Sequence, residues 1–451
     1  MCLRFRLGFA VLAITLSLNT PAHAQAPATS ANAQTAAQSV ANALAPAPST
    51  PAWWQFRAEF RERMEATSAA GFTTGRDDIY WLSRLRLNAT VTPTPWLSVH
   101  GQVQDARVGR KDVGSGGAPF SAPVDIRLAH ADIGLPGRRL TARLGRQELA
   151  FGEQRLVGHV SWMNAARSFD AARVTIRAPG VVVDAFAGSV VRITTDDWDR
   201  SGGGSAFHGV YAAATTLIPG SSVEPYFFWR ADRTVTLETG GTGRRRLATT
   251  GLRAAGALPA GFDYGIEAAV QSGSVGTDST RAWAHHMKVR TPAFGRRLRL
   301  VSEYNFASGD ENSTDGRRGT FDPLYPTPHD KYGLADQVGW RNIHHVRLGA
   351  EVGTIRGFPI VVGYHSWWLA SARDGLYLAS GAPLARIAAG APGRHVGHEL
   401  DVSASRSVTR QLQLAAGYSH IRPGTFLKAA TPGSSFHSAH LMLTYVFLAE
   451  R

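Results

Sequence analysis

From residue 53 to the C-terminus, apolar and polar side chains alternate along the chain with a period of two. In residues 54–61 the even positions are apolar and the odd positions are polar or charged. The same alternation recurs in residues 81–91, 297–306 and 439–447. Because successive side chains of a β-strand point to opposite faces of its sheet, the pattern predicts strands with one apolar and one polar face.

About 18 such segments cover nearly the whole chain and are expected to pair into hairpins. The expected strands are 54–65, 80–92, 95–107, 124–135, 138–147, 167–178, 181–193, 206–217, 222–232, 246–257, 260–272, 281–291, 297–308, 341–353, 357–370, 394–405, 411–421 and 436–448. Short links with Pro or Gly, such as residues 92–95, are expected to be turns at one end. The longest links, 309–340, 147–166 and 371–393, are long enough to fold inward and narrow a central channel.

Arginines in the middle of these strands distinguish between two all-β architectures. In a water-soluble sandwich the apolar faces pack against each other and the arginines face the solvent. In a membrane barrel the apolar face contacts lipid and the arginines face a hydrated lumen. The strands are about ten residues long, which is the length that crosses a bilayer. The sequence therefore predicts an all-β fold, a transmembrane antiparallel β-barrel of about 18 strands, in residues 53–451.

The N-terminus has the three parts of a secretory signal peptide. Arg4 and Arg6 form a basic region, residues 7–18 are apolar, and residues 22–24 form a small-x-small cleavage site. We therefore expect residues 1–24 to be a cleavable signal peptide, followed by a flexible Ala/Pro-rich periplasmic leader at 25–52. Export of a membrane barrel predicts the bacterial outer membrane as its location. The single cysteine, at position 2, lies inside the signal, so the mature chain has no disulfide and no thiolate chemistry.

Composition and charge exclude other classes. Only 18% of the residues are charged, whereas a soluble enzyme carries about a quarter. No stretch of about 18 apolar residues follows the signal, which argues against a helical membrane protein. The formal net charge of +14 is typical of nucleic-acid-binding proteins. Because the chain carries an export signal, we expect no nucleic-acid partner.

No catalytic or metal-binding signature is present in the sequence. It contains no Gly-x-Ser-x-Gly, His-Glu-x-x-His or phosphate-binding loop motif. The pairs His285-His286 and His344-His345 are adjacent on strands, so the two rings of each pair point to opposite faces and cannot share a metal. The acidic run at 196–199 is expected to be a solvated turn rather than a Ca²⁺ site. We expect no catalytic residues, no metal and no cofactor.

The strand parity places a set of cations on the polar face. These are Arg57, Arg61, Arg63, Arg84, Arg86, Arg127, Arg143, Arg173, Arg177, Lys288, Arg290, Arg297, Arg299 and Arg347. Fewer acids are expected beside them, namely Glu59, Asp125, Glu303 and Glu351. A surplus of positive charge in a narrow tube concentrates anions, and the guanidinium fork binds carboxylates bidentately. The alternative is that these arginines form ladders that stiffen the barrel, or bind lipid phosphates at its rims.

Three segments resemble the alginate export family of outer-membrane porins. The first is residues 144–158 with Trp162, Asn164 and residues 167–170; the second is residues 321–327 with His329, Gly333, Asp336, Trp340 and Asn342; the third is residues 397–401 with 417–418 and 423–424. The resemblance covers about residues 53–451, and its second segment is the most specific. The chain departs from the usual barrel terminus, because residues 448–451 follow the last aromatic residue.

This resemblance implies a monomeric barrel of 18 strands with an Arg-lined, electropositive pore, and a prototype that exports the polyuronate alginate. It also implies that Arg146, Arg155, Arg167 and Arg173 join the substrate pathway, with Asp170 among their acidic partners. The expected partners are an anionic polysaccharide or small organic anions, outer-membrane lipid, and periplasmic export proteins.

Three functions remain open from the sequence. The first is export of an anionic polysaccharide such as alginate, which needs a continuous Arg-lined tunnel. The second is uptake of small organic anions, which needs a narrower constriction that the 309–340 segment would supply. The third, a barrel enzyme, needs a Ser, His and acid cluster at the outer rim, which cannot be assembled from this sequence.

Overall fold

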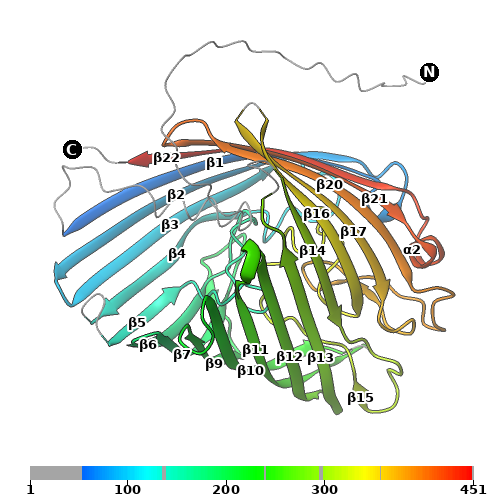
Figure 1. The fold of residues 1–451 in the computed structure, drawn as a ribbon, viewed down its shortest axis with the longest axis horizontal. Helices are drawn as coiled ribbons and strands as arrows, with labels where there is room; N and C mark the ends of the chain where they lie inside the picture. The colour runs from blue at the N-terminus through cyan, green and yellow to red at the C-terminus, as the bar shows by residue number, and fades with distance from the viewer. Residues whose placement is uncertain (1–52, 135–138, 238–239, 294–297, 356, 449–451) are drawn as a thin grey trace, which may run out of the picture.

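The computed structural model describes residues 53–134, 139–237, 240–293, 298–355 and 357–448. The signal peptide and the leader expected at 1–24 and 25–52, and Arg297, lie outside these residues. Within them, eighteen long strands follow one another around a barrel (Figure 1). They are β1 (Trp54–Ser68), β2 (Asp78–Thr94), β3 (Leu97–Gly109), β4 (Ala122–Ile133), β5 (Leu140–Gln147), β6 (Phe169–Ala178), β7 (Val181–Arg192), β9 (Ser205–Ala214), β10 (Ser221–Thr236), β11 (Thr242–Ala257), β12 (Asp263–Val275), β13 (Asp278–Arg290), β14 (Leu298–Ala307), β16 (Ile343–Ile355), β17 (Phe358–Leu369), β20 (His395–Ser407), β21 (Leu412–Pro423) and β22 (Phe436–Leu448).

The barrel is closed by the pairing of its first and last strands. Each long strand pairs antiparallel with the next, and β22 pairs antiparallel with β1 from Arg57↔Leu448 to Ser68↔His437. Closure gives each of the eighteen long strands two neighbours, so the barrel sheet has no edge strand with unpaired backbone groups among the described residues. The prediction of an antiparallel barrel of about 18 strands is confirmed.

The remaining elements are short and lie in the links. They are β8 (Arg200–Ser201), β15 (Arg317–Arg318), β18 (Leu376–Tyr377), β19 (Pro383–Ala385), α2 (Thr425–Ala430) and two 3₁₀ turns, η1 (Ala70–Phe72) and η2 (Pro259–Gly261). In the part of the chain that the structure describes, no helix has the length and apolar composition needed to cross a membrane.

The expected strand boundaries differ most at the β10–β11 hairpin. The alternation predicts strands at 222–232 and 246–257, whereas the ladder continues to Thr236 and begins again at Thr242. A register shift between Asp232 and Val235 interrupts the alternation there, and the pairing resumes beyond it. A bulge breaks the period of two without ending the strand, so the pattern underestimates the length of this hairpin.

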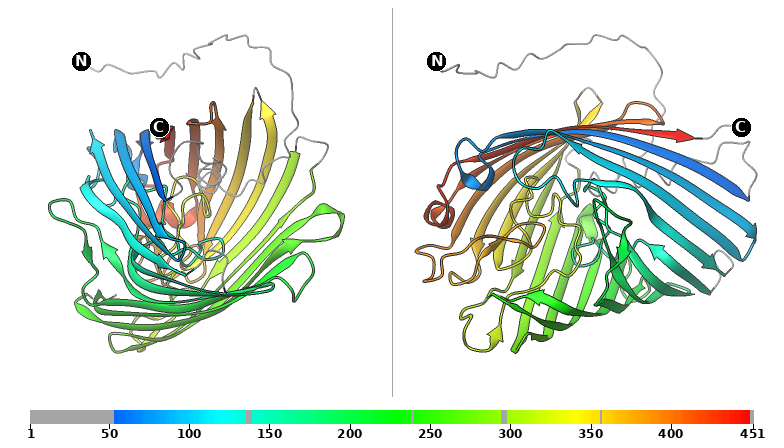
Figure 2. Two further views of the ribbon diagram at one scale, coloured as in Figure 1. Left: turned by 90° about the vertical axis from the view of Figure 1, so that its left-hand side faces the viewer. Right: turned by 180° about the vertical axis from the view of Figure 1, so that it is seen from behind.

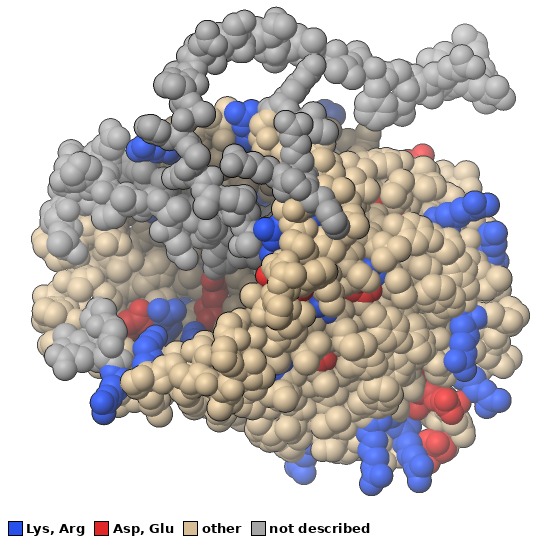
Figure 3. All heavy atoms as spheres, in the orientation of Figure 1, with Lys and Arg blue, Asp and Glu red and all other residues tan. Residues whose placement is uncertain are grey.

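Burial follows the predicted alternation along the strands. In β2, Trp81 and Leu85 are exposed, whereas Leu82, Arg84 and Arg86 are buried. Figure 3 shows one outer face of the barrel as a largely uncharged band, with Lys and Arg gathered towards the end where the long loops lie. Apolar side chains thus cover the outside of the barrel, as expected for contact with lipid.

The links differ in length at the two ends of the barrel. At the short-turn end, two residues join β2 to β3 and two join β6 to β7. At the long-loop end, residues 148–168, 308–342 and 370–394 connect β5 to β6, β14 to β16 and β17 to β20. The three long links are those expected from the sequence, within about two residues at each boundary. They extend into the space enclosed by the strands (Figure 2).

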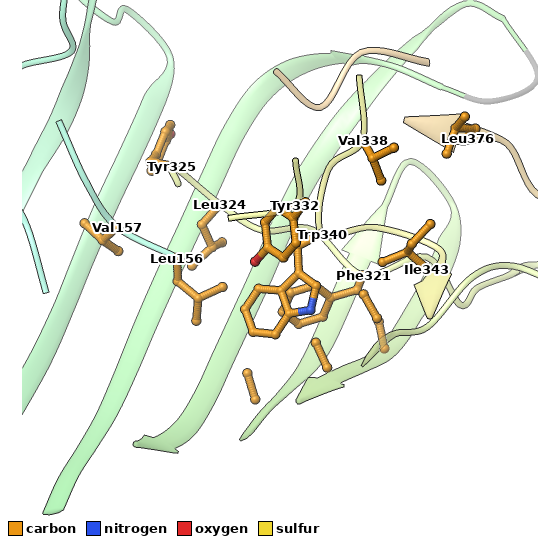
Figure 4. Packing of buried hydrophobic residues seen from close by; sticks show 14 of the residues in the cluster. Leu156, Val157, Phe321, Leu324, Tyr325, Tyr332, Val338, Trp340, Ile343 and Leu376 are labelled. Atoms are coloured by element: carbon orange, nitrogen blue, oxygen red, sulfur yellow. The ribbon is translucent and has the colours of Figure 1, made fainter. Parts of the chain in front are cut away.

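The 148–168 and 308–342 loops meet inside the barrel. A parallel bridge joins Val157 to Tyr325, and the amide of Gly158 donates to the carbonyl of Tyr325 at 2.8 Å. Apolar side chains of both loops form one buried cluster with inward-facing strand residues, as Figure 4 shows for Phe321 and Trp340. The loops therefore fill part of the lumen with a packed core.

A charge on the outer apolar band should destabilise the barrel according to its depth. Val270 lies near the middle of β12 and is 60% exposed. We expect Val270→Arg to lower the free energy of unfolding by about 2–4 kcal/mol, as for an arginine at the bilayer midplane. Leu258→Arg, in the short turn before β12, should cost about 0–1 kcal/mol. Urea unfolding of the protein in lipid vesicles measures both, and equal losses would contradict a lipid-facing band.

Candidate functional site

The inward-facing cations of β1 and β2 hold the 148–168 loop. Arg61 and Arg84 donate to backbone carbonyls of residues 161–163 at 3.0–3.2 Å, and Arg63 donates to one of these carbonyls at 2.6 Å. Arg61 lies directly opposite Arg84 in the strand register, so their like charges repel. The loop carbonyls and the carboxylate of Glu59, 2.7 Å from Arg84, offset this repulsion.

Arg127 of β4 fixes both ends of the same loop. Its guanidinium forms an ion pair with Glu148 and donates to the carbonyls of Ala166 and Arg167 at 3.3 and 3.4 Å. Burial by itself raises the pKa of Glu148, but the charge and hydrogen bond of Arg127, together with the charges of His159 and Arg86, lower this pKa to about 2. Glu148 is therefore a carboxylate at neutral pH.

The other two cationic residues of these strands make hydrogen bonds within their own wall. Arg86 is buried and donates from Nε to Gln104 Oε1 at 2.8 Å. Arg57 lies opposite Asn88, whose amide donates to the Arg57 carbonyl at 3.2 Å. For this wall as a whole, the contacts favour the structural interpretation of the arginine set, because most of its guanidinium groups are buried against a loop.

Arg155 connects the 148–168 loop to the opposite wall of the barrel. Its guanidinium lies 2.7 Å from Glu303 and 3.3 Å from both Asn305 and the Tyr332 hydroxyl. Arg347 reaches the same Glu303 carboxylate at 3.6 Å. Since Tyr332 belongs to the 308–342 loop, Arg155 ties the two loops and the wall together.

Arg167 makes the second link between the loops. Its guanidinium donates to the carbonyls of Gly158, Tyr325 and Pro326 at 2.7–3.0 Å. Burial lowers the pKa of Arg167 to about 10, so the group remains a cation at neutral pH. The family resemblance implied that Arg155 and Arg167 belong to the substrate pathway. In the structure, both side chains connect the 148–168 loop to the 308–342 loop.

The 308–342 loop is fixed to the barrel wall by two carboxylates of β20. Glu399 accepts a hydrogen bond from the amide of Ala335 and Asp401 from the amide of Leu334, both at 2.9 Å. Asp401 also contacts the His365 ring at 3.2 Å. Both carboxylates are buried, and their partners place the loop against β17 and β20.

A chain of buried polar side chains continues from these carboxylates across the neighbouring strands. His365 is hydrogen-bonded to His345 at 2.9 Å, and His345 to Asn305 at 2.9 Å. The side-chain oxygen Oδ1 of Asn305 accepts a hydrogen bond from His286 at 2.7 Å. Each of these buried side chains therefore has at least one polar partner within the wall.

A more open group of cations lies towards the short-turn end. The side chains of Arg143, Arg173 and Arg299 are 36%, 23% and 29% exposed, whereas those of Arg84 and Arg127 are 5% and 3% exposed. Each of these guanidinium groups has a carboxylate partner; the partners are Asp132, Asp184 and Asp263, at 2.5, 2.8 and 3.5 Å. Lys288 and Arg290 lie on the same inner face, paired with Glu153 and Asp263.

Arg146 and Asp170 do not face the lumen, contrary to what the family resemblance implied. They form an ion pair at 2.9 Å, but the register places them beside Ala129 and on the opposite face from Arg143. Arg146 also donates to the carbonyl of Asp199 at 3.1 Å. Because strand neighbours alternate between faces, a residue three positions after an inward-facing arginine points outward. This pair stabilises the outside of the long-loop end.

The sequence also underestimates the acids of the lumen. Inward-facing carboxylates that were not expected are Asp132, Asp184, Glu224, Glu267, Glu399 and Asp401. The alternation of inward and outward positions along each strand predicts most of them. Asp132 is hidden by a bulge at Arg127, where Gln102 pairs with Leu128 and Val103 with Ile126. This extra residue reverses the parity of β4. The surplus of positive charge in the lumen is therefore smaller than the sequence predicts.

The histidine pairs are split between the two faces, as expected. His286 and His345 are buried on the inner face, whereas His285 and His344 contact Phe306 on the outer face. Among the residues that the structure describes, no group of three or more His, Cys, Asp or Glu side chains could hold a metal ion.

Comparison with solved structures finds the same barrel in outer-membrane porins. OccK11 (OpdR) of Pseudomonas aeruginosa aligns with a TM-score of 0.58 at 12% identity, over 88% of this chain and 96% of that chain. OccAB2 of Acinetobacter baumannii aligns with a TM-score of 0.61 at 9% identity, over 88% and 98%. OccK2 (OpdF) of P. aeruginosa, solved in complex with glucuronate, aligns with a TM-score of 0.58 at 11% identity, over 88% and 98%. At these identities the similarity shows the fold.

The sequence itself was compared with families and with curated proteins. The search of curated proteins found no match. The profile of the family described as alginate export matches residues 52–439. This range includes both loops that meet in the lumen and all the long strands except most of β22. The chain therefore belongs to the alginate export family, and it is a porin-like outer-membrane barrel.

Proposed function

We propose that this protein is an anion-selective outer-membrane channel whose solutes carry carboxylates. The observation that supports this most directly is the group of partly exposed guanidinium groups at the short-turn end, which includes Arg143, Arg173 and Arg299. Guanidinium groups bind carboxylates bidentately, and a low-dielectric tube strengthens their attraction for anions. Their own carboxylate partners moderate this attraction, so binding stays reversible, as conduction requires.

The first candidate solute is an anionic polysaccharide such as alginate, leaving the cell. Membership of the alginate export family supports it. A polyuronate carries one carboxylate per sugar, so it would exchange successive carboxylates along the guanidinium groups of the lumen. Weak and repeated ion pairs suit a polymer that must move through the channel.

The second candidate is uptake of small organic anions. A specific observation favours it, because two long loops meet inside the barrel at Val157 and Tyr325 and reduce the free cross-section. OccK2, which shares the fold, was solved with glucuronate, a single sugar acid. Both candidates share carboxylate recognition and differ in the size of the solute and its direction.

Ion selectivity tests the proposal. We expect the purified protein in a planar bilayer to give an anion-selective reversal potential in a salt gradient. Arg299→Glu changes the local charge by two units at the short-turn mouth, so the anion preference should weaken measurably. Arg281→Glu makes the same change on the outer face of β13 and should leave selectivity unchanged. Cation selectivity of the unmodified protein would overturn the proposal.

The size of the solute separates the two candidates. Block of the salt current by oligouronates, compared with block by succinate, is the measurement. Stronger block by the oligomer than by the small acid supports polymer export, because a polymer occupies several guanidinium groups at once. Block by succinate alone supports the uptake of small anions.

Release of the 308–342 loop should widen the channel. The double variant Glu399→Ala with Asp401→Ala leaves the amides of Leu334 and Ala335 without acceptors, at a cost of about 1–3 kcal/mol each. We expect a larger single-channel conductance and faster proteolysis within the loop. Asp315→Ala, which removes an exposed carboxylate of the same loop, is the matched control. Unchanged conductance in the double variant would show that this loop does not limit the aperture.

The ion pair of Glu148 with Arg127 predicts the effect of acid. The pKa of Glu148 is about 2 in the folded barrel and has an ordinary value of 4.5, so the pair stabilises the loop above pH 4.5. This contribution is lost as the pH falls towards about 2. We expect constant conductance from about pH 8 to 5 and a change only below about pH 4. Glu148→Gln removes this ion pair, so its conductance at neutral pH should equal that of the unmodified protein at low pH. A change of conductance near pH 6 would contradict this assignment, because histidines titrate there.

A further inference from the structure

A cavity of about 540 Å³ opens on the inner face of the barrel at the short-turn end. Residues from β2 to β6 and the turns between them form its walls. Pockets for small ligands commonly measure about 300–1,000 Å³, so this cavity has the size of a binding site. It does not include the buried arginines that anchor the 148–168 loop.

Three guanidinium groups and one carboxylate line the cavity. Arg143 holds Asp132 bidentately at 2.5 and 2.9 Å, and Arg173 holds a carboxylate outside the lining, that of Asp184, at 2.8 Å with both nitrogens. These contacts fix the planes of two guanidinium forks. Both side chains remain partly exposed, so their free N–H groups can reach a ligand.

Arg177 adds a positive charge that neither of these two ion pairs balances. Its side chain is exposed and donates to the Thr141 hydroxyl at 3.0 Å, and among the described residues no carboxylate forms an ion pair with it. Three guanidinium groups therefore face two carboxylates, which leaves one uncompensated positive charge at the cavity. A single ligand carboxylate would balance it.

Hydroxyl groups form much of the remaining polar lining. Thr92 and Ser98 are hydrogen-bonded to each other at 2.7 Å, and Thr141 accepts from Arg177 at 3.0 Å, which leaves its own proton available. The buried Thr175 donates to Asp184 and supports the site from behind. A hydroxyl can donate and accept, so this lining matches the hydroxyls of a sugar ring. A small dicarboxylate would use the guanidinium groups and leave the hydroxyls unused.

We propose that this cavity is a binding subsite for a uronate residue, with its carboxylate on Arg177 and Arg143 and its ring hydroxyls on the threonine and serine side chains. The proposal rests on the proposed function, and it adds the sugar class and the place of first contact. In outer-membrane barrels the short turns face the periplasm and the long loops face the exterior. The subsite therefore lies at the periplasmic mouth, where it would receive sugars that leave the cell.

A two-sided block experiment in a planar bilayer tests the subsite. A trimer of galacturonate is added first on the short-turn side and then on the long-loop side of oriented channels. We expect Arg177→Gln to weaken block from the short-turn side about tenfold, the effect of losing one charge-assisted contact. Block from the long-loop side and selectivity in plain salt should change little. Arg281→Gln, on the outer face, is the matched control and should block as the unmodified protein does.

A second variant guards against misfolding. Arg143→Gln combined with Asp132→Asn removes both charges of one ion pair, so neither charge is left without its partner, and the same one-sided weakening is expected. Equal weakening from both sides, or none in either variant, would overturn the subsite while leaving anion selectivity intact. Equal block by succinate and the trimer in the unmodified protein would overturn its sugar preference. Absence of anion selectivity in the unmodified protein would instead refute the proposed function.

Discussion

The pairing of β1 with β22 is the constraint on which the rest of the molecule depends. In a bilayer each unpaired backbone group costs several kcal/mol, so an open sheet of these strands would not be stable. Closure satisfies those groups and gives the sheet an inside and an outside. Since strand side chains alternate, closure also decides the place of each charge: apolar residues contact lipid and polar residues enter the lumen. The concentration of arginine in the lumen follows from this geometry and the sequence together.

A lumen crowded with like charges would be unstable without partners. The carbonyl groups of the 148–168 loop supply them for Arg61 and Arg84, and the carboxylates of β20 hold the second loop in return. Arg61, Arg63, Arg84 and Arg127 therefore hold the 148–168 loop, and both loops occupy part of the lumen. Among the residues that the structure describes, the more exposed guanidinium groups of Arg143, Arg173 and Arg299 lie near the short turns. In the function that we propose, position along the barrel axis decides whether an arginine holds a loop or contacts a solute.

The sequence predicted the strands well because a period of two over about ten residues is a strong local signal. It predicted the inward position of Arg61 and Arg299 for the same reason. It failed where the signal is not local. The bulge at Arg127 reverses the parity of β4 and hides Asp132, and the contacts of Arg167 with residues 158 and 325–326 depend on how two distant loops meet. Pairing partners across such distances leave no periodic trace, so the role of an arginine as anchor or as open site could not be predicted.

The carboxylate partners of the open arginines argue against simple electrostatic trapping. A bare guanidinium cluster at the mouth would hold a polyanion tightly and stop its movement. With Arg143 and Arg173 each bound to an aspartate, an arriving carboxylate competes with an internal one, and its departure restores the internal pair. Exchange of equivalent partners keeps the free-energy change of each step small. Arg177, with which no carboxylate of the described residues forms an ion pair, adds one positive charge at this mouth. Selectivity and passage are compatible because the surplus charge is small and local.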